Sequence, residues 1–221
     1  MTGYGVLVQR LALFDLDNTL IDLEQAYRVW AEDFADEHGL GSEAVGWLLA
    51  LNRDGYPHRE VFFTKVQERF ALPDPVEELW GRYRRRMPYL VRCRPEVLDG
   101  LARLRTSGWR VAIVTNGTAD NQLGKIQQTG LAKAVDAYAL SGAEGIRKPE
   151  AGLLEIAAKR CGVTLAEGGW MIGDNLTADI AGGRAAGLRT IWIDRGNSPD
   201  AEHQADHVVA DVLHAIEILQ G

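Results

Sequence analysis

Two carboxylates, Asp15 and Asp17, lie two residues apart at the end of the apolar run at 11–14. Like charges held this close repel each other, and moving each one out of water costs free energy, so the pair suggests a bound cation. A structural alternative also exists, because Asp17 and Asn18 are residue types that make turns and cap helices. Residues elsewhere in the chain must decide between a metal site and a turn.

Polar residues also follow later apolar runs of the chain. Ligands of an open parallel sheet bind at the carboxyl ends of its strands, so these residues would meet at one edge. Together they offer carboxylates, a hydroxyl with backbone amides and a lysine, which suits Mg²⁺-assisted transfer of a phosphoryl group. They are Thr115, Asn116 and Gly117 after one run, Asp174 and Asn175 after another, Asp179 five residues beyond Asp174, and Lys148 in the RKPE segment at 147–150.

Each of these residues also has a structural interpretation. Thr115 could be an ordinary strand residue, and Lys148 could be solvated near the start of a helix. Asp179 could lie on the surface in the first turn of a helix, and Asp174 with Asn175 could form a cap. However, a lysine near a helix N-terminus opposes the helix dipole, so a nearby anion explains Lys148 better. The whole set therefore favours a site over several independent structural roles.

The apolar runs alternate with segments of helical spacing, and each helical segment is followed by a glycine that suits a helix C-terminus. Short runs of this kind fit strands that are buried on both faces. The predicted strands are 11–14, 111–115, 137–140, 170–173, 190–193 and 207–210, and the predicted helices are 97–106, 122–129, 151–161 and 178–186. This alternation predicts an α/β fold, a doubly wound parallel sheet with helices on both faces.

The interval from about residue 21 to residue 89 breaks this alternation. It holds stretches with helical spacing at 24–39, 43–55, 59–70 and 76–87, and it has no convincing buried strand. We therefore expect a helical domain at 21–89, inserted after the first strand into a core domain formed by 1–20 and 90–221.

The composition is that of a globular protein, because 46% of the 221 residues are hydrophobic and 25% are charged. The net charge of −7 argues against binding of nucleic acid or of an anionic membrane through bulk electrostatics. The two cysteines, Cys93 and Cys161, show neither a metal-binding nor a disulfide spacing. The N-terminal stretch lacks a long apolar segment and no run approaches the length of a membrane span, so we expect a cytoplasmic protein.

Four of these motifs resemble the signatures of the haloacid dehalogenase-like (HAD) hydrolase superfamily. That superfamily has D-x-D-x-T after its first strand, Thr or Ser closing its second, a Lys before a Pro, and G-D-x-x-x-x-D. The matching residues are Asp15-Leu16-Asp17-Asn18-Thr19, then Thr115, Lys148, and Gly173-Asp174 with Asp179. The ordered set is far more specific than any single motif. The resemblance implies a phosphatase with a Rossmann-like core and a helical cap of the C1 type inserted after the first strand.

The resemblance also implies a role for each matching residue. Asp15 would attack the substrate phosphorus and form an aspartyl phosphate, which splits one hard displacement into two easier ones. Asp17 would protonate the leaving alcohol and later take a proton from the attacking water. Mg²⁺ would be held by Asp15, by the backbone carbonyl of Asp17, by Asp174 and by waters. Around them would lie Thr19, Asn175 and Asp179, the last of which would orient Lys148 or a metal-bound water.

The same resemblance implies contacts to the substrate. Thr115, with the backbone amides of Asn116 and Gly117, would bind phosphate oxygens, and Lys148 would stabilise the transferring group. The cap would close over the site and exclude water, which suits a small phosphorylated metabolite as the partner. Candidate substrate contacts in the cap are Arg53, His58 and Arg59, although for any one of them a solvated turn is slightly favoured, because loops are polar in any case.

Asp17 also bears on the type of reaction. An alkoxide needs a proton donor in order to leave and a halide does not, so cleavage of a phosphate ester is preferred over cleavage of a carbon–halogen bond. Two alternatives to a phosphatase remain open: a phosphomutase of the β-phosphoglucomutase type, and a non-catalytic relative that binds phosphate. The oligomeric state stays open between monomer and homodimer.

Overall fold

The structure is a computed structural model, and it describes residues 10–53, 59–196 and 204–221. Within these ranges the chain divides into two compact units. One unit holds a sheet and is built from the segments before and after the other, which is helical and spans Asp22–Arg92.

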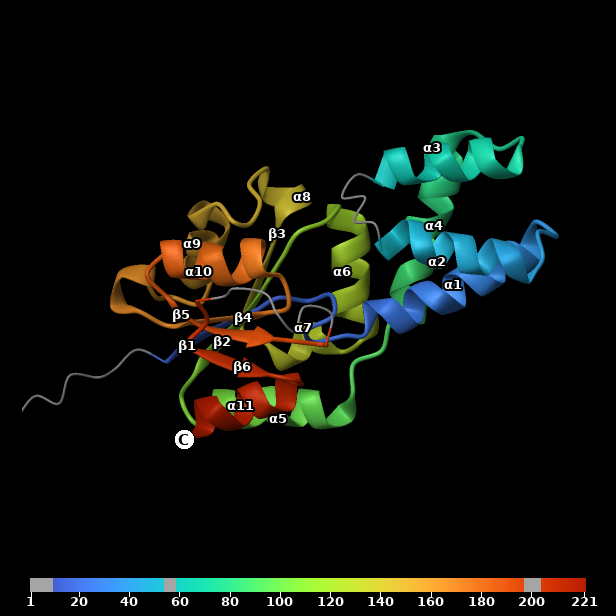
Figure 1. The fold of residues 1–221 in the computed structure, drawn as a ribbon. Coiled ribbons are helices and arrows are strands. Elements are labelled where there is room, and N and C mark those ends of the chain that lie inside the picture. Colours follow the sequence, from blue (N-terminus) through green and yellow to red (C-terminus); the bar gives the residue numbers. More distant parts are fainter. Residues whose placement is uncertain (1–9, 54–58, 197–203) are drawn as a thin grey trace, which may run out of the picture. The chain divides into compact units, whose positions relative to one another are not determined.

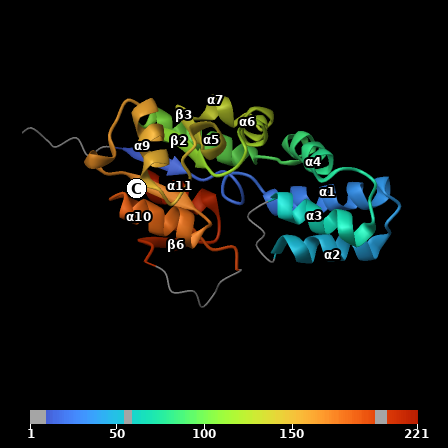
Figure 2. The same ribbon diagram turned by 90° about the horizontal axis from the view of Figure 1, so that it is seen from above.

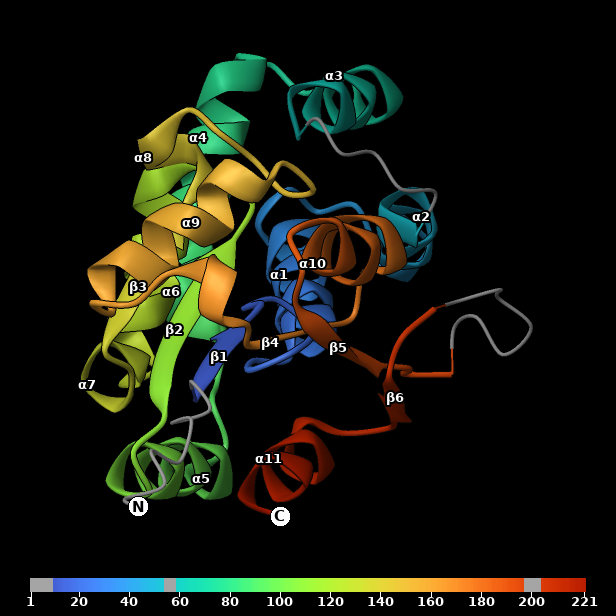
Figure 3. The same ribbon diagram turned by 90° about the vertical axis from the view of Figure 1, so that its left-hand side faces the viewer.

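Six short strands form one sheet in the described part of the first unit. Their order is β3-β2-β1-β4-β5-β6, and every neighbouring pair is parallel (Figure 3). The strands are β1 (Leu11–Phe14), β2 (Arg110–Thr115), β3 (Ala137–Leu140), β4 (Trp170–Gly173), β5 (Arg189–Ile193) and β6 (His207–Val209). This is the doubly wound parallel sheet that the alternating sequence pattern predicts, and β1 and β4 lie at its centre.

Helices cover both faces of this sheet, which explains why its central strands are apolar at almost every position. The helices α5 (Pro95–Thr106) and α11 (Val212–Gln220) pack on one face, and α9 (Ala151–Arg160) and α10 (Gly182–Ala185) pack on the other (Figure 1). The remaining α-helices in the described part of this unit are α6 (Ala119–Gln128), α7 (Leu131–Ala134) and α8 (Ser141–Glu144), and Leu165–Glu167 forms a short 3-10 helix. Among the described residues, none of the helices has the length and apolar character needed to cross a membrane.

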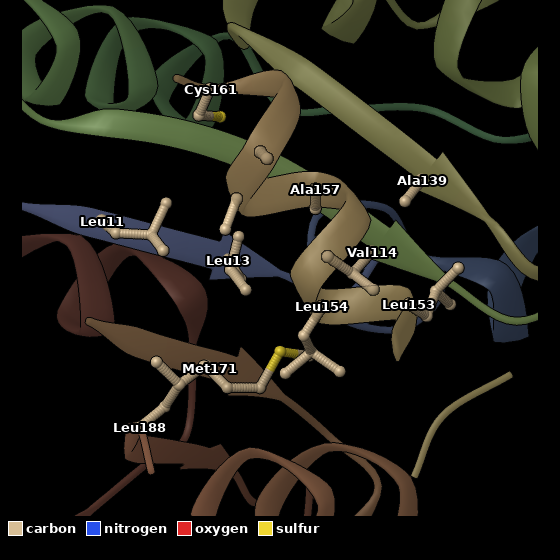
Figure 4. Close-up of a cluster of buried hydrophobic side chains, with 12 residues drawn as sticks. Leu11, Leu13, Val114, Ala139, Leu153, Leu154, Ala157, Cys161, Met171 and Leu188 are labelled. Carbon is tan, nitrogen blue, oxygen red and sulfur yellow. The ribbon is translucent and has the colours of Figure 1, made fainter. Parts of the chain in front are cut away.

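A cluster of buried apolar side chains fixes α9 against the centre of the sheet (Figure 4). Side chains of α9 meet side chains of the neighbouring strands, and complete burial of one Leu or Met contributes roughly 1.5–3 kcal/mol. The cluster includes Leu11 and Leu13 of β1, Val114 of β2, Met171 of β4, and Leu153, Leu154 and Ala157 of α9, all of which are fully buried. This packing holds together β1, β2 and β4, whose carboxyl ends carry most of the predicted site residues.

The segment after β4 differs from the helix predicted at 178–186. The chain first makes a wide π-helical turn at Leu176–Ala181 and only then enters α10. The Asn175 side chain caps this turn by accepting hydrogen bonds from the backbone N–H groups of Thr177 and Ala178, at 3.1 and 2.8 Å. Such turns are rare and occur frequently at functional sites. Here the wide turn carries Asp179, one of the predicted site residues.

The second unit is a bundle of four helices in its described residues (Figure 2). They are α1 (Leu23–Glu37), α2 (Ser42–Arg53), α3 (Arg59–Phe70) and α4 (Val76–Leu90). Asp22 caps the start of α1 by accepting a hydrogen bond from the Gln25 N–H group. The core of the bundle is aromatic, with the rings of Trp30 and Tyr83 in edge-to-face contact at 5.1 Å between centroids. This core gives the bundle a hydrophobic centre of its own.

Candidate active site

The carboxyl ends of three neighbouring strands bring the predicted site residues together. Asp15 follows β1, Thr115 ends β2 and Asp174 follows β4. Because β1 pairs with β2 on one side and with β4 on the other, these residues come from adjacent positions along one edge. The backbone N–H of Asp15 also donates to the Ile172 carbonyl at 2.8 Å, which carries the pairing of β1 and β4 as far as the site.

Three carboxyl groups of this edge lie within reach of one metal ion. Asp15, Asp174 and Asp179 each offer one carboxylate oxygen, and these oxygens all lie within 4.8 Å of one another. The Asp15 residue is only 7% exposed and the Asp179 residue only 1%. A hard divalent cation prefers oxygen ligands of this kind, so the chemistry of the donor set fits such an ion.

The electrostatics of the cluster also favour a cation. Burial raises the pKa of Asp15 well above its usual range, and the nearby charges of Asp179 and Asp174 raise it further against the opposing effect of Lys148. Burial likewise raises the pKa of Asp174, to about 7, with the charge of Asp179 as the next cause. These carboxyl groups would therefore be stabilised by protons or by a metal ion in addition to the positive charge of Lys148.

Lys148 lies between two of the carboxylates. Its Nζ donates to Asp15 Oδ1 at 2.5 Å and to Asp179 Oδ1 at 2.6 Å, and the residue is 3% exposed. Burial lowers the pKa of Lys148, but the charges and hydrogen bonds of Asp15 and Asp179 raise it by more, so its pKa lies above the usual range. The lysine is therefore a fixed positive charge beside the Asp15 carboxylate.

The backbone of Lys148 is held by the Asn116 side chain. Asn116 Nδ2 donates to the Lys148 carbonyl at 3.0 Å, and the Lys148 N–H donates to Asn116 Oδ1 at 2.9 Å. These two bonds connect the loop after β2 to the segment that precedes α9. The side chain of Asn116 thus positions Lys148, which is a role that the sequence did not reveal.

Asp179 occupies space that exists only because residue 173 is a glycine. A Cβ atom at Gly173 would overlap the Asp179 carboxyl group. The second oxygen of that group, Oδ2, accepts a hydrogen bond from the Asn175 N–H at 3.0 Å. Both oxygens of Asp179 therefore have partners, one of them Lys148. This arrangement is the one expected of a residue that orients Lys148.

The carboxylate of Asp17 has a second lysine as its partner. Lys125 of α6 donates from Nζ to Asp17 Oδ1 at 2.8 Å and to Oδ2 at 2.9 Å, and the lysine is 2% exposed. Gln122 Nε2 donates both to Asp17 Oδ2 at 3.0 Å and to Thr115 Oγ1 at 2.7 Å. Sequence reasoning missed Lys125 and Gln122. Their spacing of three residues, which puts both on one face of the helix after β2, is the signal that could have found them.

The other predicted residues of this edge differ in their hydrogen bonding. The Gly117 N–H donates to Ser141 Oγ at 2.9 Å, so a phosphate oxygen would have to replace Ser141 as its acceptor. The hydroxyl of Thr19 is buried and has no hydrogen-bond partner among the described residues. Asn18, with a φ of 59°, accepts a hydrogen bond from Arg195 Nη1 at 2.8 Å.

The predicted substrate contacts of the helical unit are only partly described. His58 and the side chain of Arg53 lie outside the described residues. Arg59, at the start of α3, has its guanidinium group over aromatic rings at 5.2–5.6 Å from their centroids and donates to Asn52 Oδ1 at 2.8 Å. The three rings are those of Tyr27, Phe62 and Tyr83. Arg59 thus packs within its own unit, and a contact to substrate remains a prediction.

Comparisons with known proteins point to one family of enzymes. A family model described as haloacid dehalogenase-like hydrolase matches residues 9–187. A phosphoserine phosphatase of Thermus thermophilus is 32% identical over 244 residues, which cover 92% of this chain and 96% of that protein. A ribulose-1,5-bisphosphate 5-phosphatase of Halopiger xanaduensis is 30% identical over 236 residues, covering 94% and 95%. A magnesium-bound crystal structure of a Bacillus subtilis HAD-hydrolase shares the fold, with a TM-score of 0.78 at 22% identity and coverage of 96% and 99%.

Proposed function

Since the chain belongs to the haloacid dehalogenase-like hydrolase family, we propose that it hydrolyses a small phosphate monoester, with Mg²⁺ as its cofactor and an aspartyl phosphate as its intermediate. The observation that carries the proposal is the position of Asp15. Its carboxyl group lies next to Lys148 and within one cluster with Asp174 and Asp179. The phosphatases among its relatives, which act on phosphoserine and on a sugar bisphosphate, support the same reaction class.

In the first step, Asp15 attacks the phosphorus atom of the substrate. A bond forms between an Asp15 oxygen and phosphorus while the bond from phosphorus to the leaving oxygen breaks. Asp17 gives its proton to that oxygen, which leaves as an alcohol. In the second step a water attacks the phosphorus of the aspartyl phosphate, and Asp17 takes the proton of that water. Inorganic phosphate and the free Asp15 carboxylate result.

Asp15 and Asp174 would hold the Mg²⁺ through their carboxylates, together with the backbone carbonyl of Asp17. When bound, the ion would neutralise part of the negative charge of the carboxylates and of the phosphate. Asp179 is better suited to orient Lys148, because its two oxygens already accept hydrogen bonds from Lys148 and Asn175. The raised pKa values of Asp15 and Asp174 support this assignment, since they reflect first the burial of these carboxyl groups and then their mutual repulsion, and a bound cation would offset both.

The phosphate would be bound by residues at the carboxyl end of β2 and in the segment before α9. Lys148 already contacts Asp15, so its positive charge can stabilise the phosphoryl group during transfer. Thr115 offers its hydroxyl, and the backbone amides of Asn116 and Gly117 follow directly in the chain. For Gly117, binding would exchange the present acceptor, Ser141 Oγ, for a phosphate oxygen. This exchange retains the number of hydrogen bonds at that amide.

The helical unit, predicted at 21–89, would act as a cap that excludes water and selects the substrate. Arg53, His58 and Arg59 remain its candidate contacts to the substrate. Arg59 is the one of these whose side chain is described, and its packing over three aromatic rings would hold its guanidinium group in a defined position. Fixed cations of this kind suit recognition of an anionic group on a metabolite.

The experiment that tests the proposal is a panel of phosphorylated metabolites assayed for released inorganic phosphate, with Mg²⁺ and with EDTA. We expect Mg²⁺-dependent release from at least one small monoester, and loss of that release in Asp15→Asn. Release that continues in Asp15→Asn would contradict the proposed nucleophile. Transfer of the phosphoryl group within a sugar phosphate, without release of phosphate in a single turnover, would instead indicate a mutase.

A further inference from the structure

We propose that Lys125 and Gln122 form a positioning pair that holds the carboxyl group of Asp17 for proton transfer. The proposal rests on the proposed function, in which Asp17 exchanges protons with the leaving group and with water. Lys125 touches neither reaction partner in this account and acts through Asp17. It is therefore a positioning residue of the reaction.

The contacts of Lys125 are directed at one group. Its Nζ donates to both oxygens of Asp17, at 2.8 and 2.9 Å. The side chain of Lys125 is 2% exposed, whereas that of Asp17 is 21% exposed. A buried lysine is costly unless a partner compensates its charge, and Asp17 is the partner it has here. Lys125 is thus a buried cation in α6, and its Nζ contacts Asp17, the predicted acid–base residue.

The side chain of Gln122 joins the acid–base residue to the phosphate site. Its amide nitrogen donates both to Asp17 Oδ2 at 3.0 Å and to Thr115 Oγ1 at 2.7 Å. Gln122 is 1% exposed, and the space that it fills depends on a glycine. A Cβ atom at Gly117 would come within 2.7 Å of Gln122 Cγ. The position of the Gln122 amide group is therefore fixed by its hydrogen bonds to Asp17 and Thr115 and by the space beside Gly117.

Each of the two carboxylates in the D-x-D motif has its own lysine partner. Lys148 binds Asp15 at 2.5 Å, and Lys125 binds Asp17 at 2.8 Å. Each lysine reaches the motif from a different direction along the chain, one from the segment before α9 and the other from α6. A side chain that is hydrogen-bonded at both of its oxygens loses most of its freedom to rotate, so Asp17 is held ready for its reaction partner.

The test compares two substrates that differ in how much they need a proton donor. p-Nitrophenyl phosphate has a good leaving group, whereas benzyl phosphate, with a ring of similar size, has a poor one. A positioned general acid contributes roughly 10²–10⁴-fold, so we expect Lys125→Met to lower kcat/KM for benzyl phosphate by about 10- to 100-fold. For p-nitrophenyl phosphate we expect a loss of less than about 3-fold, because its leaving group departs with little protonation.

Two further variants separate positioning from a general structural effect. Lys125→Arg keeps the charge and should recover most of the benzyl phosphate activity, while the exposed Lys159→Met on α9 should match the wild type on both substrates. In an Asp17→Asn background, Lys125→Met should change the remaining activity by less than about 2-fold, because its target is absent. Calorimetric titration with Mg²⁺ should give Lys125→Met the affinity of the wild type.

An equal loss on both substrates, or no loss on either, would overturn the proposal. So would a loss from Lys125→Met that is equally large in the Asp17→Asn background. Failure of the proposed function gives a different result, because the wild type would then release phosphate from neither substrate with Mg²⁺ present. Circular dichroism of each variant shows whether it is folded, and a misfolded Lys125→Met is replaced by Gln122→Met, for which the same difference between the two substrates is expected.

Discussion

Replacement of Asp174 by Asn should make the protein more stable when no metal ion is present. The carboxyl group of Asp174 has a pKa of about 7 in the folded protein, compared with an ordinary value of 3.8. Burial is the main cause and the charge of Asp179 is the next. Asn has nearly the same shape and carries no charge, so the variant removes both the cost of burying a charge and the repulsion from Asp179, and it keeps the packing.

The expected size of the effect follows from this pKa. A rise of about three pH units corresponds to at most about 4 kcal/mol of destabilisation once the group is fully ionised. Asp174 is partly exposed to solvent, which screens its interactions, so we expect Asp174→Asn to gain about 2 kcal/mol at pH 8. The pKa is raised on folding, so the penalty is absent below pH 4 and grows as the pH rises towards 7. The gain from Asp174→Asn should therefore shrink as the pH is lowered.

Urea unfolding followed by circular dichroism measures this effect, at pH 8 and at pH 4.5, in EDTA and with Mg²⁺. Mg²⁺ should stabilise the wild type by RT ln(1 + [Mg²⁺]/Kd) and leave Asp174→Asn nearly unchanged, so the order of stability should reverse when the ion is added. Asp99→Asn, an exposed carboxylate on α5, serves as the control and should stay within about 0.5 kcal/mol of the wild type. If Asp174→Asn is no more stable than the wild type at pH 8 in EDTA, the charge of Asp174 does not destabilise the folded protein.

Three other substitutions test the supports of the site. Lys148→Met should lower the free energy of unfolding in EDTA by about 3–5 kcal/mol, because it leaves two buried carboxylates without their partner; a loss below about 1 kcal/mol in urea unfolding would contradict this. Gly173→Ala should cost about 1–3 kcal/mol and abolish most phosphatase activity, because the new methyl group displaces Asp179 from Lys148; an active variant of wild-type stability would show that Asp179 can move without consequence. Asn116→Ala should cost about 1–3 kcal/mol by leaving both backbone groups of Lys148 without their partner, and its activity should fall more than that of the exposed control Asp99→Asn.

The fold could be predicted from the sequence because its strands are short, apolar and buried on both faces. The runs at 11–14, 137–140 and 170–173 coincide with β1, β3 and β4, and the other three strands differ by one residue at one end. The helix predicted at 178–186 was only partly right. Hydrogen bonds of Asn175 with Thr177, Ala178 and Asp179 shape the first turns of this segment. These hydrogen bonds depend on tertiary packing, so the spacing of apolar residues does not predict them.

Residues of the site could be predicted where they form a motif at a strand end. Asp15 and Asp174 follow β1 and β4 directly, and Asp179 belongs to the same G-D-x-x-x-x-D motif five residues further on. The three carboxyl groups lie close together at this edge of the sheet. Lys125 and Gln122 escaped because they lie within a helix, where a lysine and a glutamine are ordinary surface residues in most sequences. In the folded domain both side chains are buried and reach Asp17 in the loop after β1. This arrangement cannot be read from the spacing of residues in the helix alone.

The proposed function depends on phosphorylation of Asp15 during turnover, and trapping of the phosphorylated enzyme detects this step. The enzyme is mixed with substrate and Mg²⁺, quenched in acid within one turnover and treated with borohydride, which reduces an acyl phosphate to an alcohol. Peptide mass spectrometry then locates the reduced residue. We expect conversion of Asp15 to homoserine, and no conversion when Mg²⁺ is replaced by EDTA. Release of phosphate at the normal rate with an unmodified Asp15, or with the modification at another carboxylate, would contradict it.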